Sequence, residues 1–247
     1  MTSAAGQFPW LFFALAFLAG GSVKGALGVG LPLVTVPLLS FVMPGMQSIA
    51  LLSMPVVVSN IWQAVEGSNM RAGFRRFAGL IVAQMVATVL TVHFTLSLSP
   101  EGLNRMLAAS VLLAVALMAF QPTLRISEGR ESWVGVGVGT LSGLLGGVSS
   151  LTGPVIITYL MALQLTRNQF VSSISMIYLS GALPLYAAMA WHGRLGWNDL
   201  GLSTLALLPM GLGLLFGKAV RNRLNERLFR RVLLGFLTLL AVLLIFK

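Results

Sequence analysis

Residues 20–32 read GGSVKGALGVGLP, and residues 139–154 read GTLSGLLGGVSSLTGP. Both stretches lie in strongly apolar sequence, and both end in a segment rich in Gly, Ser or Thr that is followed by Pro. Inside a bilayer, an irregular backbone is tolerated only where it is buried in protein or lines a cavity, because unpaired N–H and C=O groups are costly there. A break of this kind in each half of a chain indicates the binding site of a membrane transporter.

The composition is that of an integral membrane protein. Of the 247 residues, 57% are hydrophobic and 9% are charged, whereas soluble domains carry about 25% charged residues. Charge-free runs cover residues 25–65, 77–100, 106–124, 132–166 and 168–191, and a membrane-spanning helix needs about 20 apolar residues. The sequence therefore predicts an all-α polytopic membrane protein with no separate soluble domain.

Several classes of function are excluded by what the sequence lacks. It contains no cysteine, which excludes disulfides, thiol chemistry and Cys-ligated metal sites. Its net charge of +10 is assigned to basic residues that flank apolar spans and set membrane orientation, so no nucleic acid partner is expected. Because no catalytic constellation is present, we expect neither an enzyme nor a bound cofactor. The N-terminal MTSAAGQFPW has no basic region, so no cleaved signal peptide is expected.

The two halves of the chain align beyond the opening motif. The matched pairs are Gly25 with Gly143, Gly28 with Gly146, Pro32 with Pro154, Gln47 with Gln169, Ser53 with Ser175, Met54 with Met176 and Gly73 with Gly196. The second copy carries four extra residues, 149–152, before its proline. The alignment predicts a first membrane repeat over 1–121, a linker over 122–132 and a second membrane repeat over 133–247.

Basic residues predict that these repeats are inverted relative to each other. In the first half they gather in the loop at 66–76, and in the second half they gather at 217–231. Each of the loops at 97–105 and 191–199 carries a single Arg. Because Lys and Arg favour the cytoplasmic side, equivalent loops are expected on opposite faces. We therefore expect about five membrane segments per repeat, both termini outside and a cytoplasmic linker.

The segments of each repeat are of two kinds. Ordinary spans are expected at 47–65, 77–96, 103–121, 168–190, 199–217 and 231–246. The Gly/Pro regions at 8–43 and 132–164 must each return to the side on which they begin. These regions are either two short crossings or one deep re-entrant hairpin, because their 36 and 33 residues are few for two full spans.

The breaks and their polar neighbours form the candidate site. Helices that begin after each break would point free N–H groups inward, and such N-termini attract small anions. Lys24 lies within the first motif, where an ionisable residue at membrane depth is by default a functional candidate that pairs with an anion or helps to couple protons. The expected substrate-binding residues are Lys24, Gly28, Gly30, Pro32, Asn60, Gln63, Ser149, Ser150, Thr152, Gly153, Pro154 and Ser175.

Each of these features also has a purely structural interpretation. The glycines can serve only to let helices pack closely, and the stem of Lys24 can carry its charge to the membrane surface. Other polar groups within the spans, Gln84 and Tyr178 among them, more often bond to neighbouring helices than to a ligand.

The motifs GALGVGLPLVTVPLL at 25–39 and GLLGGVSSLTGPVIITYL at 143–160 are similar to those of the sulfite exporter TauE/SafE family of membrane permeases. That family is a tandem duplication of such a module, and the resemblance covers essentially the whole chain. It implies transport of sulfur-containing anions or related small organic acids, such as sulfite, sulfoacetate or other sulfonates. It also implies transport driven by a proton or ion gradient, in a bacterial inner membrane.

Two functions are carried forward. The leading hypothesis is a secondary transporter that moves small organosulfur or related anions by alternating access. The alternative is a passive anion channel, because inverted repeats with re-entrant helices also build channels. The expected partners are a small anionic substrate and the lipid bilayer, and a homo-oligomer is left open.

Overall fold

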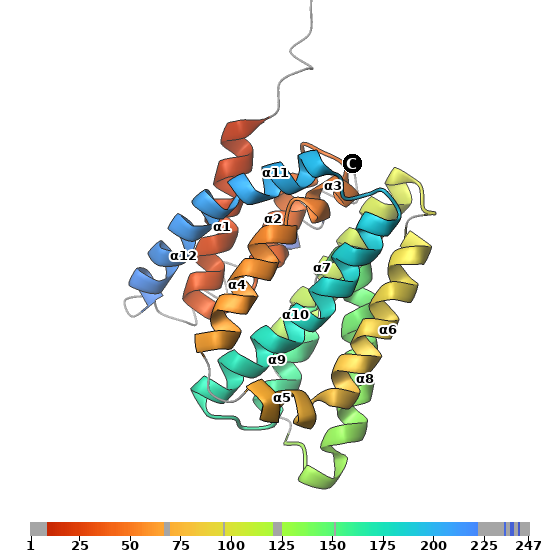
Figure 1. The fold of residues 1–247 in the computed structure, drawn as a ribbon, viewed down its shortest axis with the longest axis vertical. Coiled ribbons are helices and arrows are strands. Elements are labelled where there is room, and N and C mark those ends of the chain that lie inside the picture. The colour runs from red at the N-terminus through yellow and green to blue at the C-terminus, as the bar shows by residue number, and fades with distance from the viewer. Residues whose placement is uncertain are drawn as a thin grey trace, which may run out of the picture.

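The computed structural model describes residues 9–66, 70–95, 97–120, 125–150 and 152–221, together with positions 235, 238, 239 and 242. Every regular element within these residues is a helix (Figure 1). Five helical stretches in the described residues are long and apolar enough to cross a membrane, namely Gly45–Val65, Ala78–Thr95, Gly129–Ser149, Ser172–Trp191 and Trp197–Val220. The predicted all-α polytopic membrane protein is confirmed.

The first Gly/Pro region folds as a helical hairpin. Helix α1 (Trp10–Leu27) ends at Gly28, whose N–H donates a 2.7 Å hydrogen bond to the Lys24 carbonyl. Gly28 and Gly30 have φ angles of 82° and 103°, which glycine adopts at little cost because it has no Cβ. Helix α2 (Leu31–Leu39) then runs back along α1, as the 3.3 Å hydrogen bond from Thr35 Oγ1 to the Ala16 carbonyl shows.

The second Gly/Pro region folds in the same way. Helix α8 (Glu128–Ser149) is followed by the tip and by α9 (Gly153–Ala162), which returns toward the start of α8. The Tyr159 hydroxyl donates to the Glu131 carbonyl at 3.1 Å, and the Ile126 N–H donates to the Ala162 carbonyl at 3.3 Å. Helix α9 is about 15 Å long, half the thickness of a bilayer core, so α9 by itself is too short for a full span. The choice between a re-entrant hairpin and two short crossings stays a prediction.

The other helices match most of the expected spans. They are α3 (Gly45–Ala50), α4 (Ser53–Glu66), α5 (Met70–Arg76), α6 (Ala78–Thr95), α7 (Pro100–Phe120), α10 (Arg167–Trp191), α11 (Trp197–Leu205) and α12 (Leu207–Arg221). The span expected at 199–217 is divided into α11 and α12 at Ala206. Helix α8 begins inside the expected linker of 122–132, so residues 128–132 are helical. The span expected at 231–246 lies largely outside the described residues.

Glycines bring pairs of helices into backbone contact. Helix α6 packs along α8, and a Cβ atom at Gly143 would lie 2.5 Å from the Gln84 carbonyl oxygen. Helix α12 packs along α1 in the corresponding way, with Gly21 against the Met210 carbonyl. Small residues allow such close approach in membranes, where packing and not hydrophobic burial holds helices together. Helices α4 and α10 lie between these two pairs at the centre of the molecule (Figure 1).

Candidate functional site

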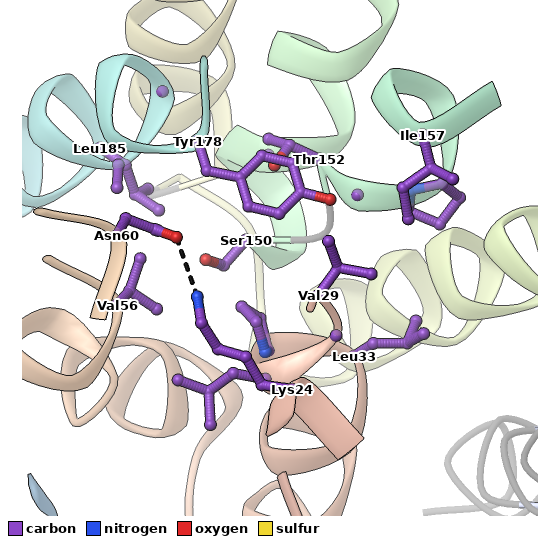
Figure 2. A pocket seen from close by; sticks show the side chains of 18 of the residues that line it. Lys24, Val29, Leu33, Val56, Asn60, Ser150, Thr152, Ile157, Tyr178 and Leu185 are labelled. Carbon is purple, nitrogen blue, oxygen red and sulfur yellow. Dashed lines mark hydrogen bonds between the residues drawn. The ribbon is translucent and has the colours of Figure 1, made fainter. Parts of the chain in front are cut away.

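The tips of the two hairpins meet at one pocket, which α4 and α10 close from the sides (Figure 2). The hairpins contribute Lys24, Gly30, Pro32, Ser150, Thr152, Gly153 and Pro154, α4 contributes Val56 and Asn60, and α10 contributes Tyr178, Gly181, Ala182 and Leu185. Stretches from both halves of the sequence, more than a hundred residues apart, therefore share a single site.

The pocket has the capacity for a small ligand. Centres of water-sized molecules can occupy about 40 Å³ of it, and one water needs roughly 10–15 Å³ of such volume. This conformation therefore has room for about three waters, or for one small anion of similar size.

Two helix N-termini open into the pocket. Helix α2 follows Gly30 and helix α9 follows Thr152, and neither of these N-cap residues provides a side-chain hydrogen bond. The N–H groups in the first turn of a helix have no partner within the helix. They also carry the positive end of the helix dipole, so each N-terminus favours a negative charge.

Lys24 places a basic amine beside these N-termini. Its side chain is 3% exposed, and its Nζ donates a 2.8 Å hydrogen bond to Asn60 Oδ1 (Figure 2). Lys24 forms no salt bridge with any residue that the structure describes. A protonated amine has three donors and no acceptor, and a buried charge is costly unless it is paired. The pocket therefore offers amine donors to spare, and a bound anion would pair the charge of a protonated Lys24.

Hydroxyl groups complete the polar lining. The Tyr178 hydroxyl is buried and has no hydrogen-bond partner among the described residues. A Cβ atom at Gly153 would lie 2.8 Å from it, so the tyrosine ring packs directly on the start of α9. Figure 2 shows the Ser150 side chain between the Lys24–Asn60 pair and Tyr178. These groups, the ammonium and the two N-termini together provide an environment for a small oxyanion.

The structure brings most of the predicted site residues to this pocket. Those that line it are Lys24, Gly30, Pro32, Asn60, Ser150, Thr152, Gly153 and Pro154. Their role as substrate contacts stays a prediction. Gly28 lies next to the lining residue Val29 and shapes the first tip without lining the pocket itself.

Three predicted residues are occupied elsewhere. Ser149 Oγ donates to the Leu145 carbonyl at 2.8 Å, within its own helix. Ser175 Oγ donates to Gln63 Oε1 at 3.1 Å, so these two side chains join α10 to α4. None of the three lines the pocket, and their hydrogen bonds are those expected of polar groups between membrane helices.

The sequence analysis placed Ser175 of α10 in the site but did not include the residues of α10 that line the pocket. Tyr178, Gly181, Ala182 and Leu185 lie three, four and seven residues apart, the spacing of one helical face. Val56 and Asn60 of α4 match Tyr178 and Ala182 at the offset that relates Gln47 to Gln169. The repeat could therefore have indicated α10, once Asn60 had been placed in the site.

Comparison with known proteins bears on this arrangement. The family model described as sulfite exporter TauE/SafE matches residues 12–244, which include both hairpins, α4 and α10. No match was found among curated proteins or among solved structures. The match extends over nearly the whole chain, and the paired motifs whose resemblance pointed to this family form the two tips of the pocket. The chain therefore belongs to the sulfite exporter TauE/SafE family.

Proposed function

We propose that this chain is a secondary transporter that moves small organosulfur or related organic anions, such as sulfite or sulfonates, by alternating access. The family implies a membrane transporter of sulfite-type anions. The proposal further includes coupling to a proton or ion gradient and a location in a bacterial inner membrane. The observation that carries it is the buried Lys24 amine, whose one hydrogen-bond partner among the described residues is the neutral amide of Asn60.

An oxyanion has the chemistry to bind the polar groups that line the pocket. Its oxygens accept hydrogen bonds from the free donors of Lys24, from the N–H groups that begin α2 and α9, and from the Tyr178 hydroxyl. Charge-assisted hydrogen bonds of this kind are about twice as strong as neutral ones. A cation would instead meet an ammonium and two positive helix ends, so the lining favours anions by its charge alone.

Alternating access is supported by the similar packing of the two halves. In each half a helical hairpin is backed by a helix of the other half, α12 behind α1 and α6 behind α8. This exchange of partners is what two inverted repeats would produce, and the binding site lies where their tips meet. Rocking of one repeat against the other would then open the pocket to alternate faces of the membrane.

The test is the flux of radiolabelled sulfite into proteoliposomes that contain the purified chain. We expect Lys24→Met to weaken the apparent affinity for sulfite roughly 10- to 100-fold, which corresponds to one hydrogen bond to a charged group. Lys24→Arg keeps the charge and should retain part of the activity. The exposed Lys218 is the matched control, because Lys218→Met removes the same charge away from the pocket. Equal flux in the wild-type and Lys24→Met chains would contradict the proposed site.

The same vesicles separate a carrier from a channel. A carrier gives flux that saturates with sulfite concentration and collapses when the proton or ion gradient is dissipated. Single-channel currents in planar bilayers would favour the passive anion channel instead.

A further inference from the structure

Gln84 is a buried polar residue whose amide has no hydrogen-bond partner among the described residues. Gln84 lies on α6, is 0% exposed, and has no hydrogen-bond partner among the described residues for either Oε1 or Nε2. An unpaired buried amide costs roughly 1–3 kcal/mol. Polar side chains in membrane helices normally bond to a neighbouring helix, which Gln84 does not do in this structure.

The amide lies at the wall of the pocket. A Cβ atom at Gly181 would collide with Gln84 Nε2 and would lie 3.0 Å from its Cδ. Gly181 itself lines the pocket, one turn beyond Tyr178 on the same face of α10. The Gln84 amide therefore occupies the space that a side chain at position 181 would take, and only the bare backbone of Gly181 separates it from the site.

Packing alone does not require a polar residue here. Gln84 presents its backbone carbonyl to Gly143 of α8, and Leu214 presents its backbone carbonyl to the matching Gly25 of α1 in the same manner. At this corresponding place, the other half has an apolar leucine. The half that carries Gln84 thus has an amide where the half that carries Leu214 has none.

We propose that Gln84 is a specificity-determining residue, whose amide turns past Gly181, where no side chain blocks it, to contact the transported anion. This inference rests on the proposed function and extends it to a class of substrate. An amide offers a donor and an acceptor together, whereas the oxygens of an oxyanion only accept. Both halves of the amide are satisfied when the anion also carries a hydroxyl or amino group. The preferred substrates are therefore small oxyanions, sulfonates above all, that bear such a second group.

Two sulfonates that differ in one hydroxyl provide the test. Binding of 2-hydroxyethanesulfonate, ethanesulfonate and sulfite is measured by isothermal titration calorimetry on the full chain in nanodiscs. We expect the wild-type chain to bind 2-hydroxyethanesulfonate at least about tenfold more tightly than ethanesulfonate, because a site built to pair a hydroxyl discriminates against its absence. In Gln84→Met this ratio should fall to about 1, while sulfite binding weakens but remains measurable.

Further variants distinguish recognition from a structural role. Gln84→Met should unfold at the same temperature as the wild-type chain or higher, because it removes an unpaired amide. Gly181→Ala displaces the Gln84 amide without altering the chemistry of that amide. It should lower the ratio of the two sulfonate affinities. Gln63→Met is the matched control, because Gln63 is buried and bonded to Ser175 but does not line the pocket. It should lower stability and leave the ratio unchanged.

The outcomes separate the two proposals. A wild-type ratio near 1, or a ratio that survives in Gln84→Met, overturns the role of Gln84 and leaves the sulfite site intact. A wild-type chain that binds none of the three anions overturns the proposed function and this inference with it. A Gln84→Met chain that loses sulfite binding and thermal stability together shows a structural residue, and it also overturns the inference.

Discussion

The Tyr178 hydroxyl lies 2.8 Å from the position that a Cβ atom would take at Gly153. This contact joins the face of α10 to the first residue of α9, at the point where the second hairpin reaches the pocket. A Cβ so close to an aromatic side chain forces something to shift, because well-packed interiors accept extra atoms only with strain. The two residues therefore set how near the start of α9 can come to the pocket.

We expect Gly153→Ala to reduce sulfite uptake at least about tenfold, because the added methyl group moves either the tyrosine or the N–H groups that begin α9. Tyr178→Phe removes the contacting oxygen, so the double variant should regain part of the lost uptake. The control is Gly137→Ala, since a Cβ at Gly137 meets no atom within 4 Å. Equal uptake by the Gly153→Ala and wild-type chains would show that the second tip does not shape the site.

Asn60→Asp should weaken anion binding while the fold is kept. The variant has almost the same shape, but its carboxylate would pair with Lys24 and cancel the charge that attracts the substrate. We expect the affinity for sulfite in calorimetry to fall by roughly 10- to 100-fold. Thermal unfolding in detergent should remain unchanged. Asn198→Asp, at an exposed position of α11, adds the same charge elsewhere and should bind sulfite normally.

Gly143→Ala and Gly25→Ala should each lower the stability of the chain. A Cβ at either position meets backbone atoms of the helix packed against it, and overpacking of this kind costs about 1–3 kcal/mol. The measurement is thermal or denaturant unfolding in detergent, with Gly211→Ala as control because a Cβ there meets nothing within 4 Å. Similar losses at positions 25 and 143 are expected from two equivalent repeats. A loss at one position alone would contradict that equivalence.

Single cysteines should report the expected orientation, since the chain contains none of its own. Arg75, Lys218 and Trp197 are all exposed. We expect cysteines at positions 75 and 218 to react with a membrane-impermeant maleimide from the cytoplasmic side only, because basic loops favour that side. A cysteine at position 197 should react from the outside. Reaction of positions 75 and 218 from different sides would exclude the inverted arrangement.

The breaks in the two hairpins could be predicted because a bilayer leaves few uses for Gly, Ser and Pro together. Gly30, Pro32, Gly153 and Pro154 interrupt apolar sequence, and interrupted helices are stable in lipid only around a cavity. The cost of burying a charge singled out Lys24 in the same way. For these residues, composition and membrane physics were enough.

The direction of side chains within a helix was harder to predict. Asn60 faces the pocket, whereas Gln63, three residues later, bonds to Ser175 on α10. Spacing alone could not separate them, because residues three positions apart lie on the same face of a helix. Gly181 was harder still to predict from the sequence, because its part in the site comes from having no side chain.

Lys24 also has an electrical consequence for a carrier built on this site. Lys24 has no counter-charge among the described residues, so an empty carrier with Lys24 protonated would hold one unpaired positive charge in this pocket, and a monovalent anion would neutralise it. Each elementary charge that crosses 100 mV changes in energy by about 2.3 kcal/mol. Membrane voltage would then act on the return of the empty carrier and leave the loaded step almost untouched.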